Sequence, residues 1–231
     1  LKIVRSANVA CGFHAGDPRE MHNLIMLASQ ESVSIGAHVG FNDLWGFGRR
    51  EIKMSAVELE YMVAYQIGAL QALAAYGDAP VTHVKAHGAL YNMAAANSDY
   101  ALAIGQAIKT VAPDLIYVGL PHSEMHRAAD KLALRFAREG YCDRRYTDNG
   151  ELVSRAIPGS VVRNTEEACE QSLRMVLHGE VVSMSGKTIK LEVDTLCVHG
   201  DETTAVAVAC QVKKALQDGG VQMVTLPELI V

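Results

Sequence analysis

The sequence predicts an α/β protein built on a mainly parallel β-sheet. Short apolar runs of strand length alternate with longer segments of helical period along the chain, and this alternation is typical of βαβ units. Histidine followed by glycine recurs where several apolar runs end, as expected for a site at the carboxyl ends of parallel strands. About six or seven such units suit a (β/α) barrel or an open doubly wound sheet, and the pattern does not choose between them.

Composition limits the class of protein. The chain has 231 residues, of which 49% are hydrophobic and 20% charged, so we expect a single globular domain over 1–231. Its 26 acidic against 21 basic residues argue against a nucleic-acid partner. There is no apolar stretch of the roughly 20 residues that span a membrane and no secretory signal. The five cysteines are spread without a C-x-x-C pair, which favours reduced thiols and a cytoplasmic location.

The first half of the chain divides clearly into elements. Asp17 and Pro18 begin one helix as N-cap and first helical residue, and Ser55 with Glu58 forms the capping box of the next. Residues 39–54 form a glycine-rich loop. The predicted strands are 2–10, 33–38 and 81–87, and the predicted helices are 17–32, 55–77 and 99–111.

The second half keeps the alternation with two interruptions. Residues 139–163 and 180–192 read as irregular or hairpin insertions. The predicted strands are 115–120, 133–139, 194–200 and 221–226, and the predicted helices are 123–132, 165–179 and 202–220.

Four histidines follow the same local pattern. His14, His38, His87 and His199 each stand at the end of an apolar strand, with glycine one or two residues later. The carboxyl ends of parallel strands lie on one face, so we expect these imidazoles to converge on a shared polar site. Neutral imidazoles can bind a divalent metal or act as general acids and bases, and both possibilities remain open.

Other polar residues join the predicted site. Lys85 precedes His87 by two residues and therefore points to the same side of its strand; it could bind an anionic group, act as an amine nucleophile or form a buried ion pair. Arginine pairs suit bidentate anion binding. Asp17 and Asp43 also read as cap or turn residues. The further candidates are Asn8, Arg49, Arg50, Asn92, Asp143, Arg144, Arg145 and Asp201.

Two tempting motifs are set aside. Cys11 follows a strand end and needs no role beyond packing. The stretch "SGKT" at 185–188 lacks the earlier glycine of a phosphate-binding P-loop, since position 181 is Val, and it precedes a predicted hairpin strand instead of a helix.

Five long motifs, in order, resemble the LamB/YcsF family: "SANVACGFHAGDP", "GAHVGFNDLWGFGRRE", "VKAHGALYN", "DRRYTDNGELVSR" and "CVHGD". The resemblance implies a seven-stranded (β/α) barrel related to the glycoside hydrolase and deacetylase type. It also implies a cytoplasmic subunit that, with two other 5-oxoprolinase subunits and ATP as co-substrate, opens the lactam of 5-oxo-L-proline to give L-glutamate, ADP and phosphate.

The resemblance also shapes the expected roles. The catalytic candidates are His14, His38, Lys85, His87, Asp143 and His199; the candidates for binding substrate or phosphate are Asn8, Arg49, Arg50, Asn92 and Arg144. Relatives carry an acidic first-strand motif before "SAN", so we expect that strand to be missing from this chain. Deacetylases bind metal through one Asp and two His, and His14 and His38 could supply the imidazoles. A metal-dependent deacetylase or carbohydrate hydrolase acting alone, and a non-catalytic scaffold, are the alternatives.

Overall fold

The computed structural model describes residues 1–77, 79–200 and 205–230. The chain divides into two compact units, Leu1–Ala137 with Thr225–Val231, and Arg138–Val224. The boundary falls inside one strand, β5. The single-domain organisation expected for 1–231 stays a prediction. Asp201 and the first residues of the predicted helix 202–220 lie outside the described residues.

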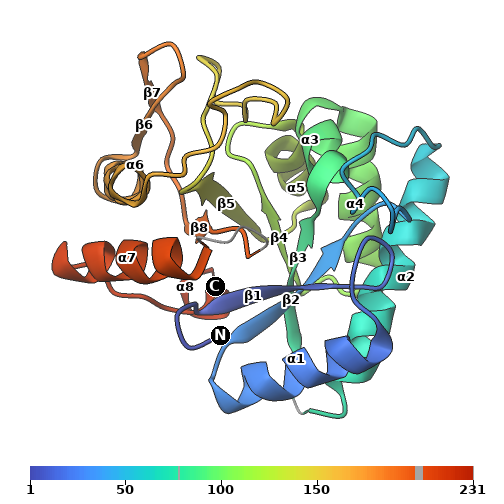
Figure 1. Ribbon diagram of the computed structural model, residues 1–231. Helices are drawn as coiled ribbons and strands as arrows, with labels where there is room; N and C mark the ends of the chain where they lie inside the picture. Colours follow the sequence, from blue (N-terminus) through green and yellow to red (C-terminus); the bar gives the residue numbers. More distant parts are fainter. Residues whose placement is uncertain (78, 201–204, 231) are drawn as a thin grey trace. The chain divides into compact units, whose positions relative to one another are not determined.

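The first unit contains four complete strands of a parallel sheet, shown in Figure 1 with α1 and α2 along one side. Its strands are β1 (Ser6–Ala10), β2 (Ser34–Val39), β3 (Val81–Ala86) and β4 (Ile116–Gly119), followed by the start of β5 (Phe136–Tyr141). Its helices are α1 (Pro18–Gln30), α2 (Ala56–Ala74), α3 (Gly88–Ala96), α4 (Ser98–Val111), α5 (Glu124–Leu132) and the short α8 (Leu226–Leu229).

The strands pair in parallel, and the register aligns their carboxyl ends. Asn8 pairs with Gly36, and His38 pairs with Lys85. Lys85 in turn pairs with Val118 of β4. The hydrogen-bonded order of the whole sheet is β1-β2-β3-β4-β5-β8. The predicted parallel α/β class is therefore confirmed with six strands among the described residues, whereas a seventh strand and a missing first strand stay predictions.

Helix starts follow the predicted capping chemistry. The Asp17 carboxylate accepts hydrogen bonds from the backbone N–H groups of Arg19 and Glu20, and Pro18 is the first residue of α1. Ser55 and Glu58 form the reciprocal capping box of α2. These caps fix where the loops after β1 and β2 end, and those loops carry much of the site.

The second unit contains the rest of β5, the strand β8 (Thr195–Cys197), and the helices α6 (Thr165–His178) and α7 (Ala205–Asp218). β5 and β8 pair in parallel, with Tyr141 opposite Cys197. Its apolar core gathers residues of α6 and α7 around the buried Cys142. The expected hairpin insertion is the antiparallel pair β6 (Glu180–Val182) and β7 (Thr188–Lys190).

Two sequence expectations differ from the structure. The predicted strand 221–226 is wrong: Thr225 instead caps α8 with Glu228. The sequence pattern also missed α3, which follows β3 directly and whose N-cap, His87, makes no capping hydrogen bond with its side chain.

The "SGKT" stretch lies at the β6–β7 turn with a strand after it, which confirms that it is not a P-loop. No described helix is both long and apolar enough to cross a membrane.

Candidate functional site

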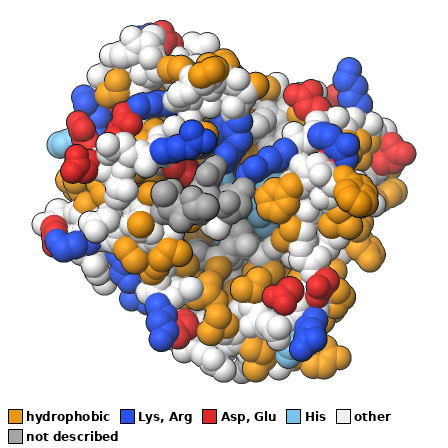
Figure 2. All heavy atoms as spheres, viewed as in Figure 1, with side chains coloured by type: hydrophobic (Ala, Val, Ile, Leu, Met, Phe, Trp, Pro, Cys, Tyr) orange, Lys and Arg blue, Asp and Glu red, His pale blue; other side chains and the backbone are white. Residues whose placement is uncertain are grey.

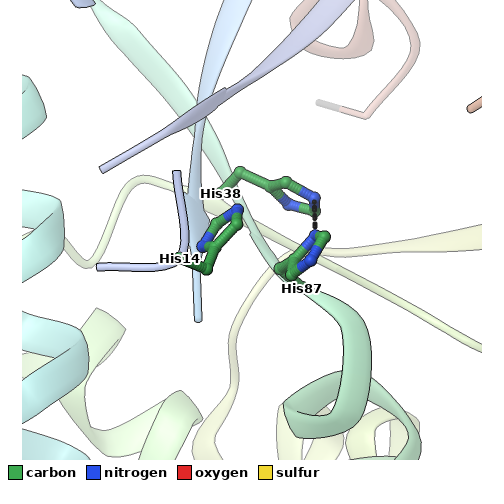
Figure 3. A group of neighbouring side chains, drawn as sticks. All are labelled: His14, His38 and His87. Carbon is green, nitrogen blue, oxygen red and sulfur yellow. Dashed lines mark hydrogen bonds between the residues drawn. The ribbon is translucent and has the colours of Figure 1, made fainter. Parts of the chain in front are cut away.

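Three of the four predicted histidines meet in the first unit. His14 lies in the loop after β1, His38 lies near the end of β2, and His87 directly follows β3. One ring nitrogen of each lies within 4.8 Å of the others. Figure 3 shows the three rings turned toward one another from neighbouring strand ends. We call them the histidine trio.

His38 and His87 form a continuous chain of polar contacts. His38 Nδ1 lies 3.1 Å from the Lys85 carbonyl oxygen, His38 Nε2 lies 3.0 Å from His87 Nδ1, and His87 Nε2 lies 2.7 Å from the Phe47 carbonyl oxygen. Each contact needs one N–H, but two neutral imidazoles carry only two. When both rings are neutral, one of the three contacts therefore lacks an N–H.

His14 packs face to face with His87. Their ring centroids lie 3.9 Å apart with an interplanar angle of 5°, whereas the His14 and His38 rings meet edge-on at 84°. His14 is buried, and its Nδ1 has no hydrogen-bond partner among the described residues. A buried nitrogen of this kind is available to a ligand in the site.

Burial keeps the imidazoles of His14 and His38 neutral. Desolvation, with a smaller effect of His87, lowers the pKa of His14 to about 3. The pKa of His38 is held well below its ordinary value by burial first, and then by the charge of Lys85 and by the neighbouring histidines. Neutral rings have lone pairs that can accept a proton or bind a cation.

Two glycines make room for the trio. A Cβ at Gly48, whose φ is +64°, would lie 2.8 Å from the His14 Cβ and 2.9 Å from His87 Cδ2. A Cβ at Gly40 would lie 2.5 Å from His14 Nδ1. The glycine-rich loop of 39–54 is therefore a requirement of close packing around the histidines as well as of backbone conformation.

Lys85 is buried on β3, with its Nζ 5.9 Å from the centroid of the Tyr91 ring. Its neighbour His83, which is absent from the residues predicted from the sequence, is also buried. Burial, and then the charge of Lys85, lower the pKa of His83 to about 3. The two-residue period of a strand is the signal that could have found it, since residues 83, 85 and 87 are expected to point to the same side.

The arginines of the loop before α2 have different environments. Arg50 forms an ion pair with Asp43, whose side chain is 1% exposed, and this hydrogen-bonded partner lowers the pKa of Asp43. Arg50 thus has a structural partner that the sequence did not predict. Arg49 is exposed and lies over the Phe47 ring at 5.2 Å.

Other candidates fall outside the trio's contacts described above. Asn8 is exposed on β1, and Asn92 is exposed on α3. Cys11 is buried and donates to the Val9 carbonyl, and burial raises its pKa to about 12. A thiol in this state is a poor nucleophile, which agrees with the packing role expected for Cys11.

In the second unit, Asp143 and His199 form a hydrogen-bonded pair. His199 Nδ1 lies 2.8 Å from Asp143 Oδ2 and 2.9 Å from Oδ1. Burial acts to raise the pKa of Asp143, but the hydrogen bonds and charge of His199 outweigh it and leave the pKa below its ordinary value. This pairing fixes the ring orientation and directs Nε2 away from the carboxylate.

Arg144 directly follows Asp143 in the sequence, and its side chain is buried. Its guanidinium donates to the Val153 carbonyl oxygen, while its Nε finds no hydrogen-bond partner in the part of the chain that the structure describes. Burial lowers the pKa of Arg144, and the charge of Arg155 adds to the effect. Arg145 instead forms an ion pair with Glu167 of α6. Anion binding by Arg144 stays a prediction.

The fold and the trio define a class: an α/β protein with a parallel sheet and a histidine cluster where its first three strands end. The sequence matches the LamB/YcsF family over residues 1–231, and the chain belongs to this family.

Named relatives agree with this assignment. The chain is 50% identical over 222 residues to a protein of Rhodopseudomonas palustris named as a 5-oxoprolinase subunit, covering 96% of this chain and 87% of the relative. It is 45% identical over 226 residues to a protein of the same name from Staphylococcus haemolyticus, covering 98% and 90%. The crystal structure of a lactam utilization protein from Thermus thermophilus superposes with a TM-score of 0.92 at 42% identity, covering 97% of this chain and 90% of that one.

Proposed function

We propose that this chain is a subunit of an ATP-dependent 5-oxoprolinase, which opens the lactam of 5-oxo-L-proline to L-glutamate together with two other subunits. The observation that carries the proposal is the histidine trio, in which burial keeps His14 and His38 neutral. Family membership and the names of the relatives supply the substrate class. The cytoplasmic location expected from the sequence belongs to the same proposal.

The chemistry explains why ATP is needed. A lactam is a stable amide, and phosphorylation of its oxygen converts that oxygen into a good leaving group. Water adds to the activated carbon, and the C–N bond breaks as the ring nitrogen receives a proton, which leaves an acyl phosphate. A second water then hydrolyses the acyl phosphate and releases phosphate and L-glutamate. In this proposal, the His38–His87 pair takes the proton from water and the buried His14 assists it.

Charged residues complete the proposal. Lys85 and Arg49 hold the substrate carboxylate or the phosphate, with Asn8, Asn92, Arg50 and Arg144 as further candidates for binding. The Asp143–His199 pair acts in proton transfer, because the carboxylate holds the proton on Nδ1 and leaves Nε2 to exchange one.

A metal-dependent deacetylase or carbohydrate hydrolase acting alone is the second candidate, and the spacing of the trio favours it. Because the His14 and His87 rings are parallel and 3.9 Å apart, one ion cannot lie in both ring planes. The His14 and His38 rings cross at 84°, so these two would supply the imidazole ligands, and His38 would have to exchange its contact with His87 for the ion. Such a cation would lower the pKa of a bound water.

The test combines the purified chain with the two other subunits, 5-oxoproline and ATP, and measures glutamate and ADP. The proposal expects glutamate only when all subunits and ATP are present. The second candidate expects a stoichiometric divalent metal and hydrolysis without ATP. Absence of glutamate from the complete, correctly folded mixture would show that the proposed function is wrong.

A further inference from the structure

Helix α2 is apolar on both sides. Its inner side is fully buried, with the side chains Leu59, Val63, Ile67 and Leu70 in the core. Its outer side carries Val57, Tyr61 and Tyr65 at four-residue spacing, and they are 56%, 68% and 64% exposed. A surface helix normally presents polar residues to water, so a second apolar face indicates a second covering surface.

The loop before α2 adds the most exposed large hydrophobic side chain of the described residues. Trp45 is 98% exposed and Leu44 is 61% exposed. Trp45 is also the single tryptophan of the sequence. A tryptophan so placed gains nothing from its own fold, whereas tryptophan and tyrosine are enriched among the residues that dominate protein interfaces.

Phe13 joins the loop to the helix. Its carbonyl accepts a hydrogen bond from the Asp43 N–H, next to Leu44, and its ring stacks on Tyr65 with centroids 5.4 Å apart. We call the resulting surface the aromatic patch. Figure 2 shows hydrophobic side chains gathered on the right of the view, over the region of α2. The aromatic patch consists of Phe13, Leu44, Trp45, Val57, Tyr61 and Tyr65.

The size of the patch fits a protein partner. At their observed exposures, Trp45, Tyr61 and Tyr65 alone offer about 500 Å². A standard interface buries about 800 Å² on each partner, so these three side chains would supply more than half of one side. Exposed apolar patches of this size on soluble proteins commonly mark interaction sites.

The patch adjoins the candidate site. Phe47 lies in the same loop as Trp45, and its ring centroid lies 5.1 Å from that of His87 and 5.8 Å from that of His14. A protein that covers the patch therefore reaches the loop that packs on the histidine trio. A partner that shares one reaction with this chain has to approach that loop, whereas a second copy of the chain does not.

We propose that the aromatic patch is the docking surface for another subunit of the same enzyme, which receives Trp45 in an apolar pocket. This inference rests on the proposed function, because the relatives are named as subunits of a 5-oxoprolinase. The contact places the partner at the rim of the histidine trio and couples binding to the Phe47 loop.

The test measures binding of the chain to the two other subunits, by titration calorimetry and by ¹⁹F NMR of the chain labelled with 5-fluorotryptophan, which gives one resonance. We expect this resonance to shift when unlabelled partner subunits are added. Trp45→Ala should raise Kd by about 30-fold or more, as expected for a hot-spot residue. Tyr61→Ala should raise it several-fold.

Tyr76→Ala is the matched control, because Tyr76 is 78% exposed but lies about 16 Å beyond Tyr65 along the helix direction; its Kd should change less than about twofold. Circular dichroism confirms that each variant is folded. An unchanged Kd for Trp45→Ala, an unshifted resonance at saturation, or failure of the wild-type subunits to bind would overturn the docking surface. A shift that depends on the concentration of the chain alone would overturn it too, by assigning the patch to a second copy.

Glutamate formation in the same wild-type mixture separates the two proposals. Turnover combined with an unchanged Kd for Trp45→Ala refutes the docking surface and leaves the proposed function intact. Binding that requires Trp45 without turnover does the reverse.

Discussion

The protonation of His83 is coupled to the stability of the first unit, because burial lowers its pKa. His83 lies on β3, two residues before Lys85, and its Nε2 is buried with no hydrogen-bond partner within the described ranges. Its Nδ1 lies 2.8 Å from the Thr82 hydroxyl. Protonation would place a second positive charge in an apolar interior beside Lys85.

The first prediction concerns stability at acid pH. Above about pH 6.5 His83 is neutral in both folded and unfolded chains. Between there and the folded-state pKa of about 3, the unfolded chain binds a proton that the folded chain does not. The free energy of unfolding therefore decreases as pH falls, by up to about 5 kcal/mol from this group.

Urea unfolding of wild type and His83→Gln between pH 4 and 8 measures this effect. The variant should lose part of the pH dependence, whereas His178→Gln, at an exposed position on α6, should keep it. Parallel curves for wild type and His83→Gln would contradict the assignment.

The second prediction concerns Gly36, which pairs with His83 across β2 and β3. A Cβ at Gly36 would lie 2.1 Å from His83 Cδ2, and both sites are buried. Gly36→Ala should therefore destabilise the fold by about 2 kcal/mol or more. Gly68→Ala is the control: no atom of the described residues lies within 4 Å of its added Cβ in α2, so it should stabilise by about 0.5–1 kcal/mol. If adding His83→Ala to Gly36→Ala restored no stability, the steric explanation would be wrong.

At the scale of elements, the loop between β2 and α2 gives different environments to two adjacent arginines that look alike in sequence. Arg50 holds the buried Asp43, which also accepts the Gly46 N–H, whereas Arg49 is exposed beside Phe47. The sequence motif "GFGRR" offers both side chains equally to an anion. In the fold, Arg50 is paired with Asp43 of the same loop.

The third prediction uses this difference. Arg50→Ala should lower the melting temperature and raise the pKa of Asp43 toward its ordinary value, because the carboxylate loses its main partner. Arg49→Ala should leave the pKa of Asp43 unchanged and raise KM for 5-oxoproline about tenfold or more in the reconstituted enzyme. Thermal unfolding, carboxyl NMR titration and steady-state kinetics measure these quantities. An equal rise in the pKa of Asp43 in the two variants would contradict the distinction.

Much of the element pattern could be predicted from the sequence, because apolar period and caps are local. The α1 and α2 starts at Asp17 and Ser55 follow from their own side chains. The start of α3 has no such signal, since its N-cap is a site histidine. The strand expected at 221–226 was wrong because apolar β-branched residues there precede a capped helical turn.

The site could be predicted as a gathering of strand-end histidines, and this is confirmed for His14, His38 and His87. The ring stacking and the hydrogen bond between His38 and His87 could not be predicted, because they depend on side-chain rotamers and on the loop that brings the Phe47 carbonyl to His87. The partners of Arg50 and His199 are likewise set by tertiary contacts.

At the scale of the whole molecule, the proposed function rests on two findings, which are membership of the LamB/YcsF family and the histidine trio. The trio contains two neutral imidazoles, His14 and His38, and the relatives are named as subunits of a 5-oxoprolinase. In our proposal, the exposed aromatic patch is the surface for docking of a partner subunit.

Glutamate release by the reconstituted enzyme tests the central claim most directly. His38→Ala, assembled with the two other subunits and supplied with ATP and 5-oxoproline, should lower kcat at least about 100-fold, because it breaks the pair that carries the proton. Tyr76→Ala, measured alongside, should keep wild-type turnover. A His38→Ala complex that assembles normally and releases glutamate at the wild-type rate would contradict the claim that the histidine trio performs the chemistry.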